Sequence, residues 1–119
     1  MCRFYLEYEE NTIYLHNLSN NVQIMDNTFI GQIEGTLKQN WDLDALTDYN
    51  GSTLQYKDVA RKIEKMHILM AEGGVEKGDK IAICGRNSSH WGVAFLATVT
   101  YGAVAVPILH EFTPEVVHN

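Results

Sequence analysis

The sequence predicts an α/β domain with a partial, open, mostly parallel sheet, flanking helices and a preceding β-hairpin. A strand pattern at Lys80–Cys84 is followed by an apolar helix pattern and by a second strand pattern at Ala103–Ile108. A connection of this length suits the helical crossover of a parallel strand pair. The hairpin is predicted by Asn50-Gly51, which stands between two short apolar-containing runs.

Length and composition are those of an ordinary globular protein. The 119 residues suit about one domain, and 45% of them are hydrophobic and 20% charged. The formal net charge of −6 argues against a nucleic-acid partner, because phosphate binding needs a basic face. Two cysteines, Cys2 and Cys84, form neither a disulfide framework nor a metal motif, which favours a reducing, cytoplasmic setting.

Residues 1–26 are predicted to be an N-terminal extension, and residues 27–119 the first part of a larger domain. In the extension, Arg3–Tyr8 and Thr12–His16 are two strand-like runs, and a loop composition follows. Met25 is an alternative start of the chain, because the stronger pattern begins just after it.

The first helix is expected after Asn27 or Thr28, either of which can serve as its N-cap. Its apolar residues fall on one helical face: Phe29, Ile30, Ile33 and Leu37.

The clearest helix pattern follows the hairpin. The negative charge of Asp58 is stabilising at the positive N-terminal end of this helix. Gly73-Gly74 can form a left-handed C-terminal cap. The apolar side chains of this helix recur at helical spacing: Val59, Ile63, Met66 and Met70.

The third helix is predicted after the Lys80–Cys84 strand, with Asn87 as its N-cap and Gly102 at its end. It is apolar nearly all round and is therefore expected to be buried on more than one side. Ala103–Ile108 is expected to be a strand buried on both faces, as in parallel sheets.

One alternative concerns a membrane. Trp91–Leu109 is a run of 19 residues without a charge, which is near the length that spans a bilayer. Gly102 and Pro107 interrupt this run, and its composition changes at Gly102. These breaks favour a buried helix followed by a strand, with no transmembrane segment.

No catalytic, cofactor-binding or metal-ligating residue is assigned from the residues present. His110 and His118 lie too far apart for a zinc-protease helix, which needs its second His where Pro114 stands. Arg86 could hold an anion at a strand-to-helix junction, and a plain connecting loop is the competing interpretation.

The remaining candidates have structural interpretations. Ser88 and Ser89 suit a helix start rather than a nucleophile, because no Gly-x-Ser-x-Gly elbow occurs. Trp91, Phe95 and Met66 are interpreted as core residues rather than cofactor contacts.

Four stretches resemble motifs of the AMP-forming adenylate ligases, which include acyl-CoA synthetases, luciferases and peptide-synthetase adenylation domains. These stretches are Leu54–Val59, Gly74–Ile83, Asn87–Trp91 and Tyr101–Pro107. Asp58 and His90 depart from the family pattern, which has Glu at both places. The Val106–Ile108 and Phe112–Glu115 segments look most like the long-chain fatty acyl-CoA synthetase branch.

This resemblance implies a two-step reaction in the full-length protein. A carboxylic acid, here a fatty acid, attacks ATP with Mg²⁺ to give an acyl-adenylate and pyrophosphate, and the thiol of CoA then displaces AMP. The family's phosphate loop, ribose-binding Asp, hinge and catalytic Lys would all lie beyond residue 119. We therefore expect residues 1–119 to be inactive alone and to bind none of these cofactors.

The C-terminus predicts a continuing domain. Thr113-Pro114-Glu115 is a strong helix start, yet only four residues follow it. A truncated sheet leaves an unpaired edge and uncovered apolar surface, so we expect self-association. The alternative is a stand-alone, non-catalytic binding or assembly module. The expected location is cytoplasmic, either free or peripheral to a membrane.

Overall fold

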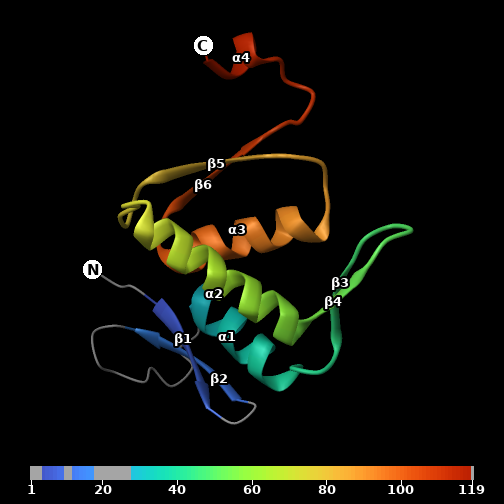
Figure 1. The fold of residues 1–119 in the computed structure, drawn as a ribbon, viewed down its shortest axis with the longest axis vertical. Helices are drawn as coiled ribbons and strands as arrows, with labels where there is room; N and C mark the ends of the chain where they lie inside the picture. The colour runs from blue at the N-terminus through green and yellow to red at the C-terminus, as the bar shows by residue number, and fades with distance from the viewer. Residues whose placement is uncertain (1–3, 10–11, 18–27, 119) are drawn as a thin grey trace.

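The computed structural model describes residues 4–9, 12–17 and 28–118, with side chains described from residue 28 to residue 118. The elements in chain order are β1 (Phe4–Glu9), β2 (Thr12–Asn17), α1 (Phe29–Gln39), β3 (Asp44–Thr47), β4 (Thr53–Gln55), α2 (Tyr56–Glu72), β5 (Lys80–Cys84), α3 (Ser89–Tyr101), β6 (Val104–Ile108) and α4 (Pro114–His118). Helices α2 and α3 pack on each other at the centre, with the β5–β6 pair on one side of them and the β1–β2 hairpin on the other (Figure 1). The predicted α/β class is confirmed.

The two N-terminal strands are antiparallel, with a register that runs from Phe4 opposite Asn17 to Glu9 opposite Thr12. The expectation of two strands in this region is therefore confirmed. The hairpin lies against α1 and α2. The alternative start at Met25, the loop at residues 18–21 and the Asn27 cap lie outside the described residues.

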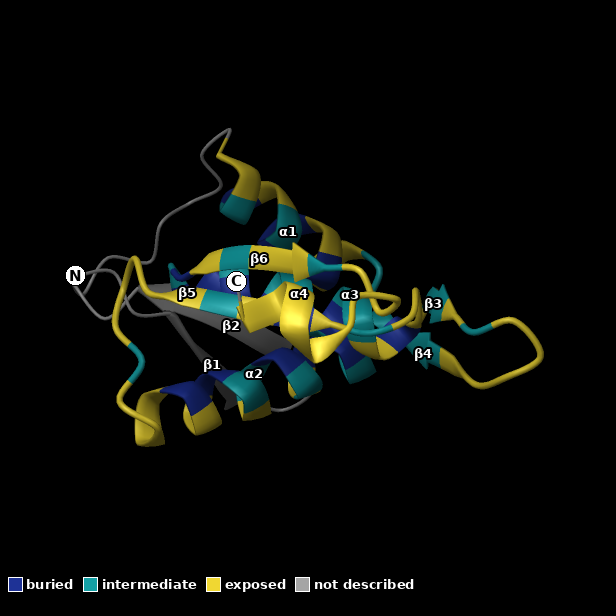
Figure 2. Cartoon of the chain, turned by 90° about the horizontal axis from the view of Figure 1, so that it is seen from above, coloured by how far each residue is buried: buried dark blue, intermediate teal, exposed yellow. Residues whose placement is uncertain are grey.

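Helix α1 begins after Thr28, whose hydroxyl accepts a hydrogen bond from the Gly31 backbone N–H at 3.1 Å. Phe29, at the start of the apolar face predicted for this helix, is 57% exposed. The start of α1 at Phe29 is exposed, and burial begins at Gly31 (Figure 2). Leu37 is buried, and the buried Glu34 pairs with Lys38 at 2.6 Å.

The predicted hairpin is confirmed as the antiparallel pair β3–β4. The Asp48 N–H donates to the Ser52 carbonyl at 3.0 Å, so three residues form the turn. Asn50 takes the left-handed conformation, with φ of 53°. Gly51 is needed for a different reason, because a Cβ there would lie 2.9 Å from the Asp48 Cβ.

Helix α2 buries the predicted apolar stripe. Val59, Ile63 and Met70 are buried, and Met66 packs against this cluster. The Gln55 backbone N–H donates to the Asp58 carboxylate at 2.9 Å, which satisfies a donor at the helix start. Gly74, with φ of 77°, forms the predicted left-handed end.

Strands β5 and β6 form the predicted parallel pair, in a register that runs from Lys80 opposite Val104 to Cys84 opposite Ile108. The connecting helix α3 ends at Gly102, which has φ of 92°. The parallel sheet of the described residues consists of these two strands, and the other two strand pairs are antiparallel.

Two predictions about α3 have different outcomes. Its burial on several sides is confirmed, because it contacts α2, β3, β5 and β6. The prediction of Asn87 as its N-cap is wrong, because the Ser88 hydroxyl accepts the Trp91 N–H at 3.2 Å. The Ser89 N–H donates to Asp48, so two N–H groups of the first turn have side-chain acceptors with the helix starting at Ser89.

The expectation that β6 is buried on both faces is also wrong. Val104 is 47% exposed and Val106 is 37% exposed. Helix α3 packs on one face of the β5–β6 pair. Helix α4 is drawn in front of the other face in Figure 2, but Figure 1 shows that it stands away from the sheet, and all of its residues are exposed. We call the uncovered side the open sheet face; its exposed residues are Lys80, Ala82, Cys84, Val104 and Val106.

The C-terminal helix start is confirmed. The N–H groups of Val116 and Val117 both donate to the Thr113 carbonyl, at 3.0 and 3.2 Å. Hydrogen bonds from its own backbone N–H and from Thr113 hold the pKa of the Glu115 carboxyl below its ordinary value. Helix α4 is exposed along its whole length and stands apart from the helical core (Figure 1).

The apolar run considered for a membrane is divided between α3 and β6. Among the residues described here, no helix has both the length and the apolar character needed to cross a bilayer.

Candidate functional site

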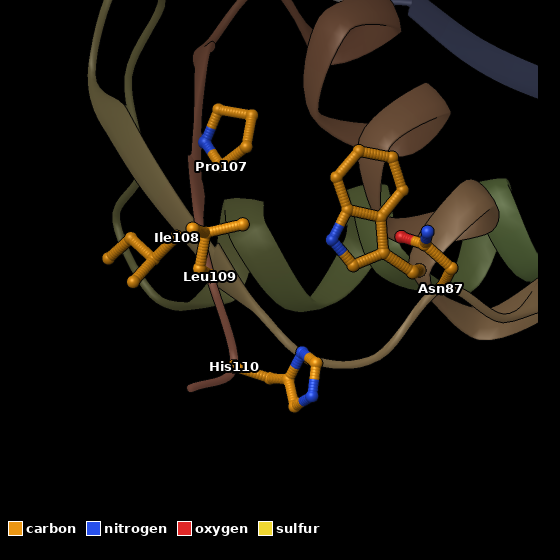
Figure 3. Close-up of a pocket in the computed structure, with 7 residues that line it drawn as sticks. Asn87, Pro107, Ile108, Leu109 and His110 are labelled. Carbon is orange, nitrogen blue, oxygen red and sulfur yellow. The ribbon is translucent and has the colours of Figure 1, made fainter. Parts of the chain in front are cut away.

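A cavity of about 220 Å³ lies at the carboxyl ends of β5 and β6 (Figure 3). In open α/β sheets, ligands bind outside the carboxyl ends of the strands, so this is where the fold would place a site. Its lining residues are Gly85, Asn87, Trp91, Pro107, Ile108, Leu109 and His110.

Three elements build this cavity. Gly85 and Asn87 come from the loop that leaves β5, and Trp91 comes from the first turn of α3. The opposite wall is formed by the last two residues of β6, Pro107 and Ile108, and by the two residues after it, Leu109 and His110 (Figure 3). The parallel register therefore brings together two chain segments that are about 20 residues apart in the sequence.

Trp91 and Phe95 correct the prediction that they are core residues. Both are half-buried, and neither belongs to the buried cluster around α2 and α3. Their rings stack on each other with centroids 5.6 Å apart and an interplanar angle of 6°. The stacking on Phe95 holds the Trp91 ring in position, and the Trp91 side chain also lines the cavity. Met66, in contrast, packs against the core as predicted.

The N-terminus of α3 already binds a carboxylate, and that carboxylate belongs to this chain. Asp48, at the end of β3, accepts the Ser89 backbone N–H at 2.6 Å and the Ser89 hydroxyl at 2.7 Å. These two hydrogen bonds hold the pKa of the Asp48 carboxyl below its ordinary value near 3.8. We call this contact the Asp48–Ser89 clamp. Ser89 is therefore a structural residue, as its helix-start interpretation predicted.

This arrangement bears on the anion site considered at Arg86. Arg86 is exposed and does not line the cavity. The nearby helix N–H groups of Ser89 and Trp91 are taken by Asp48 and Ser88. A further anion would also meet the negative charge of Asp48. The geometry therefore favours the competing interpretation, a connecting loop.

Sequence patterns did not identify two polar contacts of α3, one with α2 and one with the loop that follows α2. The His67 Nε2 lies 3.0 Å from the Ala97 carbonyl and 2.9 Å from the Thr100 hydroxyl, which joins α2 to α3. The Tyr101 hydroxyl donates to the Val75 carbonyl at 2.7 Å. Neither contact could be found from spacing, because each depends on how α2 and α3 pack.

His110 and His118, which the sequence analysis compared with a zinc site, lie on different parts of the C-terminal region. His110 Nε2 lies 4.0 Å from Glu111 Oε1, and His118 is on α4. Within the described ranges, no group of three or more His, Cys, Asp or Glu is placed to hold a metal ion.

A second hollow of about 220 Å³ lies between α1, β3, α2 and α3. Its lining is almost entirely apolar: Ile33, Thr36, Leu37, Ala45, Leu46, Tyr56, Val59 and Leu96. Gly92 allows the close approach of β3 to α3, because a Cβ there would lie 3.3 Å from Leu46 Cδ1. This hollow is continuous with the core and has no titratable side chain other than Tyr56, so it offers no catalytic chemistry.

The fold and the cavity define an α/β unit with an open sheet and a helical crossover. Comparison with known protein families identifies it further. Residues 33–119 match the model of the AMP-binding enzyme family, and this match covers most of the chain. The chain belongs to the AMP-binding enzyme family.

Two proteins with similar sequences illustrate the range of this family. A hybrid PKS-NRPS synthetase of Fusarium sp. (strain FN080326) is 30% identical over 77 residues, which are 65% of this chain and 2% of that protein. YdaB of Bacillus subtilis (strain 168), named as a candidate acyl–CoA ligase, is 31% identical over 62 residues, which are 52% of this chain and 12% of that protein.

Two solved structures of NpsA from Klebsiella oxytoca share the fold. Its N-terminal subdomain matches with a TM-score of 0.69 and 20% identity, over 76% of this chain and 23% of that one. NpsA in complex with 3-hydroxyanthranilyl-AMSN matches with a TM-score of 0.66 and 22% identity, over 81% and 19%. The chain therefore spans less than a quarter of the length of each of these relatives. The resemblance to adenylate-forming enzymes is confirmed.

Proposed function

We propose that this chain is the N-terminal portion of an ATP-dependent, AMP-forming fatty acid–CoA ligase. The observation that carries the proposal is the family match over residues 33–119, which spans the four motif-like stretches. In the structure those stretches become the start of α2, the turn into β5, the start of α3 and the passage from α3 into β6. We assign these four stretches structural roles: they begin helices and connect helices to strands.

The proposed reaction has two steps. A carboxylate oxygen of the acid attacks the α-phosphorus of ATP, and pyrophosphate leaves. The thiol of CoA then attacks the acyl carbon, and AMP leaves with the bonding electrons of the acyl–oxygen bond. Mg²⁺ would neutralise phosphate charge during the first step.

The described residues do not fit ATP or Mg²⁺. They hold no carboxylate cluster for a metal ion, and the start of α3 is taken by Asp48. No step of the reaction is therefore assigned to a residue of this chain. Its proposed contribution is to hold the β5–β6 sheet and its helices in place for the remainder of the enzyme.

The identity of the carboxylic acid substrate is the more specific part of the proposal. The Val106–Ile108 and Phe112–Glu115 segments and the likeness to YdaB support a fatty acid and CoA. The likeness to PKS-NRPS synthetases supports a competing acid, an amino acid.

The test starts from the natural protein, captured with an antibody raised against residues 1–119. We expect an intact mass several times 13.5 kDa, pyrophosphate exchange into ATP that depends on a fatty acid, and formation of the acyl-CoA thioester. Purified residues 1–119 should show no exchange. Exchange that responds only to amino acids would replace the fatty-acid assignment with a peptide-synthetase one.

The alternative function is a stand-alone, non-catalytic binding or assembly module. A natural mass near 13.5 kDa with no exchange activity would establish this alternative. A cytoplasmic location and self-association of residues 1–119 through the open sheet face are further parts of the proposal.

A further inference from the structure

We propose that the cavity at the carboxyl ends of β5 and β6 binds a small, neutral, planar ring that carries an amide-like polar group. This site is separate from the adenylation chemistry proposed above and does not depend on it. The proposal rests on the lining of the cavity, on its charge and on the space beside Gly85.

The apolar part of the lining suits a flat ring. Trp91 supplies an indole whose position is supported by stacking on Phe95 at 5.6 Å. Pro107 lies across the cavity from the β5–α3 loop (Figure 3). A planar ring gains contact with an aromatic face at little conformational cost, whereas a flexible chain must be ordered. The volume of about 220 Å³ limits the occupant to a single ring with a small substituent.

The polar part of the lining suits a neutral ligand. No Asp, Glu, Lys or Arg lines the cavity. Charges of both signs lie beside it: Arg86 stands between two lining residues, Glu111 Oε1 lies 4.0 Å from His110 Nε2, and Asp48 binds Ser89 at the start of α3. Because none of the residues that line the cavity is a Lys or Arg that could pair with it, a buried carboxylate or phosphate is disfavoured there.

Two side chains can hold the substituent. Asn87 has an amide with both donors and an acceptor, and the His110 imidazole has two ring nitrogens that can take part in hydrogen bonds. They lie on different walls of the cavity (Figure 3). An amide on the ring can form reciprocal donor and acceptor contacts with Asn87, and a carboxylate cannot.

Gly85 leaves the space that the ring would use. A Cβ at this position would meet only Trp91 Cδ1, at 3.9 Å, which is an ordinary contact. Gly85→Ala should therefore fold normally, and Gly85→Leu should place its side chain in the cavity.

The experiment is a titration of the 119-residue chain with benzamide at pH 8, followed by the indole N–H signals in ¹⁵N–¹H spectra. The chain has two tryptophans, and Trp41 packs near Arg61, 5.9 Å from its guanidinium carbon, away from the cavity. We expect the Trp91 signal to shift to saturation with a Kd of about 1–10 mM, as suits a ligand of this size. The Trp41 signal should not move.

Matched probes and variants separate this site from weak, general binding. Cyclohexanecarboxamide has the same amide on a puckered ring and should bind roughly fivefold more weakly. Gly85→Leu should abolish the Trp91 shift and Gly85→Ala should retain folding, while Asn87→Ala should weaken binding roughly threefold or more. Gln39→Ala, on α1, is the control and should change nothing. Equal shifts at both tryptophans, a response that never saturates, or full binding by Gly85→Leu would each overturn the proposal.

Discussion

The α2–α3 core and the C-terminal region from β6 to α4 are both rich in apolar residues, but only the first is covered. In the core, Ile63 is 1% exposed, and polar contacts from His67 and Tyr101 join neighbouring elements. On the open sheet face and on α4, valines point to solvent. Apolar composition therefore predicts the capacity to be buried, and burial itself depends on which element lies opposite.

The largest expected effect tests the covered side. Ile63→Ala should lower the free energy of unfolding by about 3–4 kcal/mol, because it leaves a cavity between α2 and its neighbours. Urea unfolding followed by circular dichroism measures this change. Leu109→Ala, at an exposed position after β6, is the matched control and should change the free energy by less than about 0.5 kcal/mol. Similar losses in both variants would contradict the comparison.

The second effect concerns the polar contacts of the core. Tyr101→Phe removes the hydroxyl that donates to the Val75 carbonyl, and should lower the free energy of unfolding by about 1–2 kcal/mol. Tyr49→Phe removes the same atom from a side chain that is 95% exposed and should have no measurable effect. Urea unfolding of the two variants, side by side, makes the comparison; equal midpoints would show that the Val75 contact does not matter.

The third effect is smaller and depends on pH. The folded-state pKa of Asp48 is lowered, so the clamp stabilises the fold above the ordinary carboxyl pKa near 3.8. That stabilisation should disappear as the pH falls from about 3.8 through the lower folded-state pKa.

Asp48→Asn should therefore unfold at a lower urea concentration than the wild type at pH 6, and the difference should shrink below pH 4. Asp44→Asn, on the same hairpin, is the control, because no hydrogen bond to Ser89 involves it. A difference between Asp48→Asn and wild type that stays constant from pH 6 to pH 3 would rule out this role for the clamp.

The smallest effect on stability is expected on the open sheet face. Val106→Lys should change the free energy of unfolding by less than about 0.5 kcal/mol, yet it should reduce self-association by placing a charge on an uncovered strand. Light scattering at high protein concentration measures the average mass. Ser52→Lys adds the same charge at the hairpin turn and should leave association unchanged. A monodisperse wild-type monomer would overturn the prediction of self-association.

Most elements could be predicted from the sequence because their signals are local. Asn50-Gly51 marked the hairpin, the repeat of Val59 and Ile63 marked α2, and Gly102 marked the end of α3. The division into residues 1–26 and 27–119 stays a prediction. The errors arose where a residue distant in the sequence determined the local structure. At the start of α3, Asp48, about 40 residues earlier, accepts the backbone N–H of Ser89, and Ser88 is the N-cap in place of Asn87.

The candidate site was less predictable than the fold. The sequence drew attention to the loop after β5 through Arg86, whereas the cavity is formed by Gly85, Asn87 and Trp91 with the end of β6. Strand register brings these segments together, and register is a property of the assembled sheet. No spacing rule along the chain would have joined Asn87 to His110.

The sequence by itself determined the order and type of the elements, and the family to which the chain belongs, because turn residues, apolar periodicity and short motifs act over a few residues. Only the tertiary structure decided which apolar faces are covered, which carboxylate occupies the start of α3, and where a cavity opens at the end of the sheet. Burial and hydrogen bonding are settled between segments that are distant in the chain, so their outcome depends on packing and cannot be read from local pattern.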